Sequence, residues 1–225
     1  MKEVPSHKLN FRNNITYEVN SQTPFTGYAV QYYDNGEIHF KTRYEKGYQE
    51  GESISYYPSG QWKFKGSFKK DISDGPFEIY YENGQLNEKG TYKDGHKYGP
   101  YERYYENGHL DYKCTYKDGN RDGPFERYYE NGYLDYKFTY KEGLLDGPCE
   151  YYNENGHLKY KCTYKEGNRD GPYESYNRDG KLRHKGTFKN GLENGVRETF
   201  TSNGKLWMKA KYIDGETDGS IETYS

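Results

Sequence analysis

A 24-residue motif occurs eight times in succession along this chain of 225 residues, with no insertion or deletion between copies. The best-formed copy starts at Gly99 and reads GPYERYYENGHLDYKCTYKDGNRD. Its first glycine recurs at Gly27, Gly51, Gly75, Gly99, Gly123, Gly147, Gly171 and Gly195, and Gly219 begins a ninth copy. A strict period of this length predicts a linear array, in which each repeat packs on its neighbours and not into one globular centre.

The composition indicates how such an array is held together. Leu, Ile, Val and Phe make up only 31 of the 225 residues, a share that is otherwise typical of disordered chains. Two features oppose disorder, because the net charge is only −2 and the 30 tyrosines recur with the period of the motif. We therefore expect a folded array whose cohesion comes from half-buried aromatic rings and not from a thick aliphatic core.

Each repeat contains two short segments with the alternation of β-strands. In the copy from Gly99 these segments are residues 100–105 and 110–116, and Asn107-Gly108 lies between them. Asn-Gly between alternating segments is the strongest local hairpin signal, because both residues tolerate positive φ. A second turn, at residues 118–123, joins each hairpin to the next. The sequence thus predicts an all-β fold, an elongated antiparallel meander of β-hairpin repeats with about 16 strands that forms an open array.

The period also divides the chain. Residues 1–26 are expected to form an N-terminal segment that is irregular over 1–14 and contains a cap strand at 15–19. Residues 27–218 hold the eight repeats, and residues 219–225 hold half of a further repeat with a single edge strand. We read this as one repeat domain with a short segment at each end.

The two-residue period of a strand predicts two different faces. In the second strand of the copy from Gly99, one face would carry Leu110, Tyr112, Cys114 and Tyr116, and the other Asp111, Lys113, Thr115 and Lys117. The position between the two tyrosines is mostly a small residue, which leaves space for rings from adjacent strands to lie over the backbone.

The register of the hairpin remains open at this level. A two-residue turn at Asn107-Gly108 would place Lys113 opposite Glu102, whereas a three-residue turn with a bulge would place Tyr104 opposite Leu110.

These residues also carry a family resemblance. The segment 112–119, which in other copies reads Tyr-x-Gly-x-Tyr or Tyr-x-Gly-x-Phe, resembles the Y-x-G-x-F/W-x-x-G signature of MORN repeats. The longer pattern Y-Y-E-N-G-x-L with K-x-G-x-x-D-G resembles the bacterial MORN-repeat variant of YwqK-type antitoxin-like proteins, over residues 27–225. The resemblance implies a twisted sheet of hairpins without catalytic residues, which acts through protein contacts or, in some MORN proteins, through phospholipid contacts. Several copies depart from the signature by replacing its glycine, at Thr42, Cys114, Phe138 and Cys162.

The histidines and cysteines are not placed for metal or disulfide chemistry. His109 and His157 lie two repeats apart, about 19 Å at the usual strand spacing, which is too far for one metal ion. Cys114 and Cys162 are also two repeats apart, and Cys149 lies in the other strand, so we expect small packing residues and no disulfide. We expect no metal, no cofactor and no catalytic residue, because no copy of the motif differs from the others in a chemically suggestive way.

Two classes of ligand are disfavoured. The balance of 33 basic and 35 acidic residues argues against nucleic-acid binding, which needs a basic groove. The sequence has no long apolar segment of the kind that spans membranes, so we do not expect insertion into a membrane, and membrane contact is disfavoured relative to protein contact.

The sequence therefore predicts a non-catalytic scaffold that binds another protein, with a toxin as a candidate partner. The candidate contact residues are tyrosines of the middle repeats: Tyr112, Tyr116, Tyr136, Tyr140, Tyr160 and Tyr164. The alternative is an exported surface protein that contacts host or cell-envelope ligands, and a third reading is a phospholipid-contacting membrane organiser. The strand at 221–224 would offer an open edge for self-association.

The compartment stays open as well. No signal peptide is visible in the sequence, so a cytoplasmic location follows if the chain is complete as given. An exported location follows if a leader has been removed.

Overall fold

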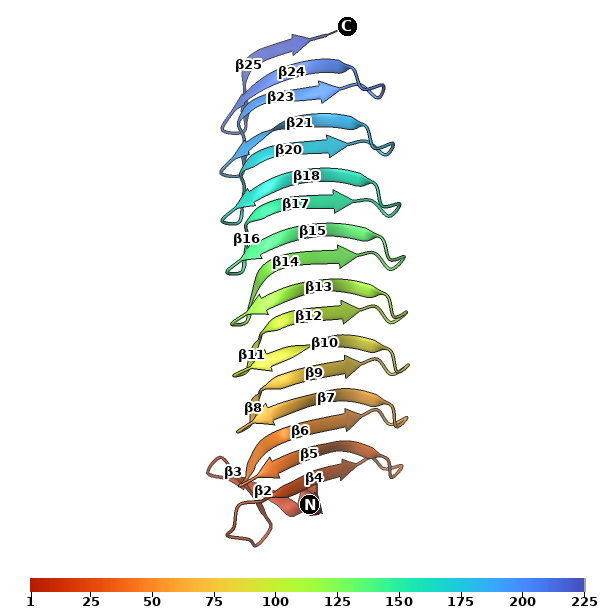
Figure 1. Cartoon of the computed structure of the whole chain (residues 1–225), viewed down its shortest axis with the longest axis vertical. Helices are drawn as coiled ribbons and strands as arrows, with labels where there is room; N and C mark the ends of the chain where they lie inside the picture. Colours follow the sequence, from red (N-terminus) through yellow and green to blue (C-terminus); the bar gives the residue numbers. More distant parts are fainter. Residues whose placement is uncertain (225) are drawn as a thin grey trace. The chain divides into compact units, whose positions relative to one another are not determined.

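The structure, a computed structural model, describes residues 1–224, which form strands joined by turns and one short 3₁₀ helix (Figure 1). The chain divides into two compact halves, which are described separately. The N-terminal half comprises Met1–His109 and Tyr116–Gly119, and the C-terminal half comprises Leu110–Thr115 and the residues from Asn120 onward. In both halves successive hairpins pair antiparallel in sequence order, so the prediction of an all-β, open meander of hairpin repeats is confirmed.

The N-terminal half begins with a short segment outside the repeats and continues with the first hairpins. Its elements are β1 (Glu3–Pro5), η1 (Ser6–Lys8), β2 (Leu9–Arg12), β3 (Ile15–Glu18), β4 (Gly27–Tyr32), β5 (Ile38–Glu45), β6 (Tyr48–Tyr56), β7 (Trp62–Lys69), β8 (Ile72–Ser73), β9 (Gly75–Tyr80), β10 (Leu86–Lys93), β11 (His96–Lys97) and β12 (Gly99–Tyr104). From β4 to β7 each strand pairs with the next one along the chain. The short strand β8 and the longer β9 both pair with β7, β9 also pairs with β10, and β11 and β12 both pair with β10.

The C-terminal half continues the same pattern, in the green to blue part of Figure 1. Its strands are β13 (Leu110–Lys117), of which only Leu110–Thr115 belong to this half, β14 (Asn120–Tyr128), β15 (Leu134–Lys141), β16 (Leu144–Leu145), β17 (Gly147–Tyr152), β18 (Leu158–Lys165), β19 (Asn168–Arg169), β20 (Gly171–Tyr176), β21 (Leu182–Lys189), β22 (Leu192–Glu193), β23 (Gly195–Phe200), β24 (Leu206–Ile213) and β25 (Glu216–Thr223). The structure thus has more strands than the expected 16, and the reason lies in one recurring interruption.

Five of the eight repeats split their first strand at the residue before the first glycine, which is Asp74, Tyr98, Asp146, Asp170 or Asn194. In β15, Tyr140 pairs with Leu145 of β16 and Lys137 pairs with Glu150 of β17. Between these two pairs β15 has only residues 138–139, whereas the strand made of β16 and β17 has residues 146–149. The strand made of β16 and β17 therefore bulges. The strand therefore continues through the bulge as two paired pieces.

The Asn-Gly turn is a three-residue loop and not the two-residue turn that this dipeptide favours. The Gly132 N–H donates to the Tyr129 carbonyl at 2.9 Å, and the Tyr129 N–H donates to the Tyr133 carbonyl at 2.8 Å. Gly132 has φ 88°, whereas the φ of Asn131 is negative. This is the three-residue hairpin in which the glycine occupies the left-handed position and forms a bulge.

The two-residue turn occurs instead at the other end of the strands. Lys141 pairs with Leu144, and between them Glu142 has φ 50° and Gly143 has φ 85°. Two consecutive residues at positive φ are typical of the tight type I′ hairpin. The Asn-Gly dipeptide thus lies in a three-residue loop, and the two-residue turn is formed by Glu142-Gly143.

The bulge at the Asn-Gly turn also settles the register, because it combines the two alternatives in one hairpin. In the β14–β15 hairpin Glu126 pairs with Lys137, as a two-residue turn would require, and Tyr128 pairs with Leu134, as a bulge would require. The shift between these pairs leaves Asp135 as the extra residue.

This bulge corrects the predicted faces at the Leu position. Trp62 occupies that position in its repeat, and its ring centroid lies 5.8 Å from that of Tyr80 and 3.0 Å from Lys65 Nζ. Lys65 occupies the motif position of Lys113, on the face opposite the tyrosines. The side chain at the Leu position therefore lies on that face and not with the tyrosines. The extra residue reverses the alternation between the turn and the rest of the strand.

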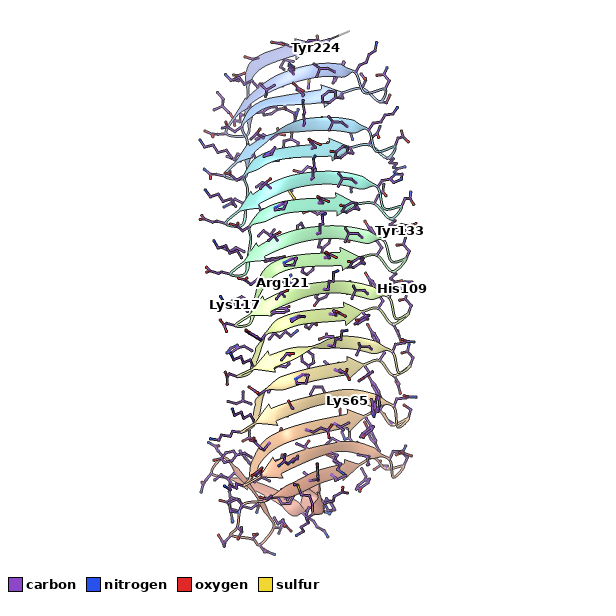
Figure 2. The ribbon with its side chains drawn as sticks, viewed as in Figure 1. Lys65, His109, Lys117, Arg121, Tyr133 and Tyr224 are labelled. Atoms are coloured by element: carbon purple, nitrogen blue, oxygen red, sulfur yellow. A yellow bond between two sulfur atoms is a disulfide. The ribbon has the colours of Figure 1, made fainter. Side chains whose placement is uncertain are left out.

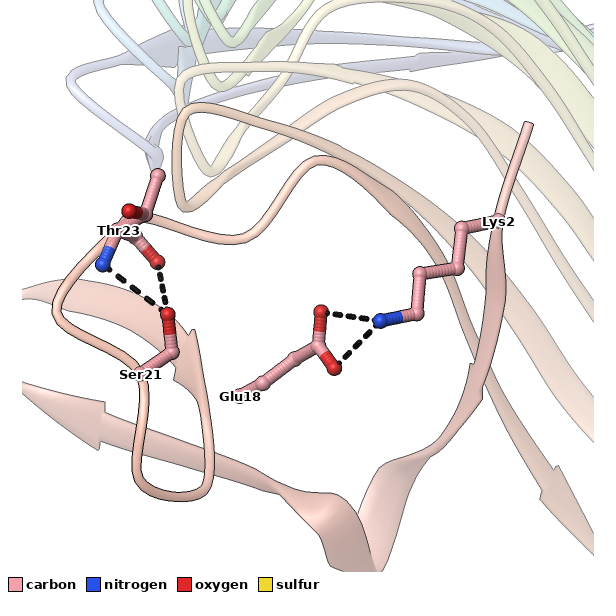
Figure 3. Close-up of polar contacts among 4 residues, drawn as sticks. All are labelled: Lys2, Glu18, Ser21 and Thr23. Atoms are coloured by element: carbon pink, nitrogen blue, oxygen red, sulfur yellow. Dashed lines mark hydrogen bonds and ion pairs between the residues drawn. The ribbon is translucent and has the colours of Figure 1, made fainter.

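The N-terminal segment folds against the first hairpin. Residues 3–5, expected to be irregular, form β1, which pairs parallel with β4 through Val4 and Ala29. The predicted cap strand forms as β3 but pairs with β2. Lys2 Nζ lies 2.7 Å from both Glu18 carboxylate oxygens, which joins β1 to this small hairpin, as Figure 3 shows.

The interior of the array is a layer of rings over small residues, as the sequence predicted. A Cβ atom added at Gly186 would lie 2.8 Å from Tyr173, and one added at Gly90 would lie 3.0 Å from Phe77 and 3.1 Å from Tyr101. Phe77 and Tyr101 are only 4% and 3% exposed. Glycine at these positions therefore lets a ring from an adjacent strand rest on the backbone.

The prediction about the cysteines is wrong for one pair. Cys149 and Cys162 form a disulfide across the β17–β18 hairpin, with 5.2 Å between their Cα atoms. They are direct cross-strand partners and are 1% and 5% exposed. The comparison of Cys162 with Cys114 missed this pair because the disulfide lies within one hairpin, in a register that the sequence left open. Cys114 is buried at 6% exposure.

Candidate binding surface

One face of the C-terminal half carries an uninterrupted ladder of aromatic rings. From Tyr112 to Tyr173, each of the long strands β13, β14, β15, β17, β18 and β20 contributes one ring. The centroids of neighbouring rings are 5.4, 5.8, 6.0, 5.9 and 6.0 Å apart. We call this the ladder face and define it by Tyr112, Phe125, Tyr136, Tyr151, Tyr160 and Tyr173. Ring pairs at these separations stabilise each other by about 0.5–1.5 kcal/mol beyond the area that they bury.

The ladder is built by both strands of each hairpin. Tyr136 of β15 pairs in register with Arg127 of β14 on one side and with Tyr151 of β17 on the other. The ladder therefore has a fixed geometry that does not depend on loops.

Arginines are interleaved with the rings. The Arg121 guanidinium carbon lies 4.6 Å from the Phe125 centroid and 5.5 Å from that of Tyr140. The Arg169 guanidinium carbon lies 5.6 Å from the Tyr160 centroid. Figure 2 shows Arg121 on β14 and, in the same half, Tyr133 at the Asn-Gly turn. The ladder face thus combines tyrosine and arginine, the residues that dominate protein-binding hot spots.

The structure places the six predicted contact tyrosines in two rows. Tyr112, Tyr136 and Tyr160 belong to the ladder itself. Tyr116, Tyr140 and Tyr164 lie four residues further along their strands, and their centroids are 5.5 Å from Tyr101, 5.8 Å from Phe125 and 6.5 Å from Phe138, respectively. All six are half-buried.

Sequence reasoning missed the rings from the first strand of each repeat. Phe125, Tyr151 and Tyr173 complete the ladder, and the arginines Arg121 and Arg169 lie over it. The sequence does contain a signal for these rings, because an aromatic residue directly follows the proline of the motif at Phe125 and Tyr173. Assigning these rings to the face of the second-strand tyrosines also requires the hairpin register.

Burial affects the hydroxyls of two ladder tyrosines, Tyr151 and Tyr160. Burial raises the pKa of Tyr160, and burial together with the neighbouring Tyr164 raises the pKa of Tyr151. At neutral pH these phenols are therefore uncharged hydrogen-bond donors on the aromatic surface.

The opposite side, which we call the charged face, carries rows of lysine, glutamate and tyrosine. In five consecutive repeats the lysine is bonded to the glutamate of the following repeat, at 2.7–2.8 Å: Lys89–Glu102, Lys113–Glu126, Lys137–Glu150, Lys161–Glu174 and Lys185–Glu198. A tyrosine two residues further along donates its hydroxyl to the same glutamate, as Tyr128 does to Glu126. These pairs link successive repeats, whereas the sequence suggested a pair within one hairpin.

The charged face has a defined electrostatic state. The hydrogen bond from Lys161 lowers the pKa of Glu174, and the bond from Tyr176 adds to this. Burial alone would raise the pKa of Glu126, but its bonds to Lys113 and Tyr128 outweigh burial and the net pKa is lowered. Burial raises the pKa of Tyr80 to about 12.

Acid is therefore expected to weaken the array. A carboxylate whose pKa is lowered on folding contributes stability above its unfolded pKa of about 4.3, and this contribution is lost as pH falls through the folded value. Because Glu126, Glu150, Glu174 and Glu198 are all shifted in this direction, the urea midpoint should fall steadily below about pH 4.5. Circular dichroism at a series of pH values measures it. The variant Glu174→Gln should show a shallower decline, and a midpoint that stays constant from neutral pH to pH 3 would contradict the assignment.

The described residues offer no metal or membrane-spanning feature. No cluster of three or more His, Cys, Asp or Glu side chains placed to hold a metal ion occurs within residues 1–224. No helix in the same range is both long and apolar enough to cross a bilayer.

Hollows lie on both faces, and two of them bear on the candidate surface. One of about 720 Å³ lies on the charged face of the N-terminal half, between Lys65, Lys89, Glu78 and Glu102. The other, of about 450 Å³, lies on the ladder face of the C-terminal half beside Tyr151 and Tyr160.

Solved structures resemble the chain only distantly. A chain in the TcdB2–TccC3–Cdc42 crystal structure is 12% identical with a TM-score of 0.24, over 90% of this chain and 13% of that one. A chain in the TcdB2–TccC3 crystal structure is 12% identical with a TM-score of 0.25, over 90% of this chain and 14% of that one. Our chain thus spans about one seventh of these much longer chains. No curated protein matches it.

The family comparison is specific. The MORN repeat variant family matches seven consecutive segments, which start with the second copy of the motif: residues 49–70, 73–94, 97–118, 121–142, 145–166, 169–190 and 193–214. MORN repeats are generally non-catalytic binding modules. These seven matches cover more than half of the sequence, and the chain belongs to the MORN repeat variant family.

Proposed function

We propose that this chain is a non-catalytic scaffold that binds another protein through its ladder face, and that a toxin neutralised by this binding is the first candidate for the partner. The observation that carries the proposal is the unbroken series of rings from Tyr112 to Tyr173, in which Phe125 and Tyr173 are buried and the other four rings are half-buried. Such rings present a large amphipathic contact area with little conformational entropy to lose. The sequence resemblance to antitoxin-like repeat proteins supports the nature of the partner.

The binding residues proposed are the six tyrosines of the two rows: Tyr112, Tyr116, Tyr136, Tyr140, Tyr160 and Tyr164. The repeats that carry them, residues 99–170, form the centre of the array, flanked by repeats on both sides. We further propose that β25, which is exposed along its length with Ile221 at 56%, serves as an edge for self-association. In the proposed division of the chain, residues 1–26 form an N-terminal segment, residues 27–218 form the eight repeats and residues 219–225 form a half-repeat.

A second candidate function is that of an exported protein that contacts ligands of a host or a cell envelope. One observation favours it, because the Cys149–Cys162 disulfide is of a kind that persists in oxidising compartments. Both candidates use the ladder face, and they differ in the partner and in the compartment.

The test is affinity capture from the source organism with wild type and a ladder variant. The ladder variant combines Tyr112→Ser, Tyr136→Ser and Tyr160→Ser. Loss of hot-spot rings costs at least about 2 kcal/mol each, so the partner should bind at least about 30-fold more weakly.

A matched control lies one residue further along each strand. The variant Lys113→Ser, Lys137→Ser and Lys161→Ser changes the same three repeats on the charged face and should capture the partner as wild type does. Circular dichroism must show that both variants are folded. If the folded ladder variant keeps every partner of wild type, the tyrosines serve only to hold the array together.

A further inference from the structure

The hollow on the ladder face of the C-terminal half has an unusual lining. It is lined by Tyr151, Lys159, Tyr160, Arg169, Ser175, Tyr176 and Arg183. Three of these side chains are cations and none is a carboxylate. This pocket of about 450 Å³ therefore has a positive lining on an aromatic floor.

Three neighbouring strands bring the cations together. Tyr160 of β18 pairs with Ser175 of β20, and Ser175 pairs with His184 of β21. Lys159 and Arg183 are the sequence neighbours of the outer two residues, so they flank Ser175 from strands about 10 Å apart. A ligand group seated over Ser175 would lie between them.

The third cation comes from the adjoining short strand β19. Arg169 lies over the Tyr160 ring, with 5.6 Å from its guanidinium carbon to the ring centroid. Its Nε donates to the Tyr164 hydroxyl at 3.5 Å. The ring contact and this hydrogen bond leave guanidinium donors for a ligand.

The cations of this pocket differ from those of the charged face. In the hollow between Lys89 and Glu102 the lysine is already neutralised by an ion pair at 2.8 Å. Within the described residues, Lys159, Arg169 and Arg183 take part in no ion pair with a carboxylate. Arg183 contributes to lowering the pKa of His184, after burial as the main cause, which agrees with a positive local potential.

The floor of the pocket contains hydroxyls that lack a partner. The Tyr160 hydroxyl and the Ser175 hydroxyl are both buried and have no hydrogen-bond partner among the described protein atoms. Buried polar groups are rarely left in this state. A ligand with acceptor oxygens would satisfy both hydroxyls after a small side-chain movement.

We propose that this pocket binds the carboxylate of an acidic side chain on an extended segment of the partner protein. The proposal rests on the proposed function, because it assigns to the ladder face the site that anchors its partner. Arginine matches the geometry of a carboxylate with paired N–H donors, and the pocket contains two arginines with a lysine. The aromatic floor suits the aliphatic stem of a glutamate.

The test measures binding of a short poly-glutamate peptide to the full chain by calorimetry at low ionic strength. Wild type should bind this peptide and should not bind poly-lysine of the same length. The variant with Lys159→Gln and Arg183→Gln should bind at least roughly ten-fold more weakly, because it removes two of the three cations that line the pocket. Both side chains are exposed, so the variant should keep its fold.

A control with the same change in charge is Lys165→Gln with Lys181→Gln, which alters two exposed lysines outside the pocket. This control should bind as wild type does. An equal loss in both variants would mean that net charge alone attracts the peptide and would overturn the proposal. Inorganic phosphate that binds as tightly as the peptide would overturn it as well, and so would binding to phosphatidylserine vesicles without binding to the peptide.

The failure of this inference can be told apart from failure of the proposed function. If the Lys159, Arg183 variant still captures the partner and the ladder variant does not, the ladder face binds the partner without this anchor. If both variants keep the partner, the ladder face itself is not the binding surface.

Discussion

Replacing Phe125 by alanine is expected to lower the free energy of unfolding by about 3–5 kcal/mol, the range for removal of a buried phenylalanine. Phe125 is 4% exposed. Its ring lies 5.4–6.4 Å from four other rings, those of Tyr112, Tyr136, Phe138 and Tyr140. Because these rings come from strands on both sides of β14, no single neighbour can move to fill the cavity. Chemical denaturation followed by circular dichroism measures the loss.

The matched control is Tyr133→Ala in the same repeat. Tyr133 lies at the Asn-Gly turn and is 53% exposed, so its removal should change the free energy of unfolding by no more than about 0.5 kcal/mol. Similar losses for the two variants would mean that the ladder does not carry the cohesion of the array. A single-layer sheet with few aliphatic residues would then need another source of stability.

Breaking the Cys149–Cys162 disulfide should lower the free energy of unfolding by about 3 kcal/mol, the value expected for a closed loop of roughly this length. The two cysteines are 13 residues apart, and the bond restricts the unfolded chain. They occupy the position at which other repeats place a ring over a small residue, so the bond also replaces a ring contact in the core. Denaturation of wild type refolded with and without a thiol reductant measures the difference.

The double variant Cys149→Ala and Cys162→Ala provides the control, because its stability should not respond to the reductant. It retains Cys114, so any effect of that residue would appear in the control. Equal denaturation midpoints for oxidised and reduced wild type would show that the bond adds no stability to this hairpin.

The hairpin repeats were predictable from the sequence because their signals are local and occur in every copy. The period, the two strands of each repeat and the small residues beneath the rings follow from glycine positions and two-residue alternation. Gly90 and Gly186 illustrate this, since each lies under the ring of an adjacent strand.

The faces near the turns could not be predicted, because one extra residue reverses the alternation. Trp62 lies with Lys65 and not with the tyrosines, and only the bulge explains this. Asn-Gly is a signal for a two-residue turn, yet the strands here are joined by a three-residue loop with glycine alone at positive φ. The energy difference between such turns is too small to be decided by a dipeptide.

The disulfide and the ladder depended on the same missing register. The register that places Glu150 opposite Lys161 also places Cys149 opposite Cys162. It likewise brings Phe125 and Tyr173 to the face of the second-strand tyrosines. The N-terminal segment was misread for a different reason, because the pairing of β1 with β4 is a contact between distant parts of the sequence that has no local signal.

Site-specific photo-crosslinking tests most directly whether the ladder face binds the partner. A photoreactive phenylalanine analogue would replace Tyr136 on the ladder face or, in a second protein, Tyr152 on the charged face, and irradiation would take place in the source organism. Both tyrosines are half-buried, so the comparison isolates the face. The proposal predicts an adduct to a protein partner from position 136 and none from position 152. An adduct from position 152 alone would contradict it, and would place the binding surface on the rows of lysine and glutamate.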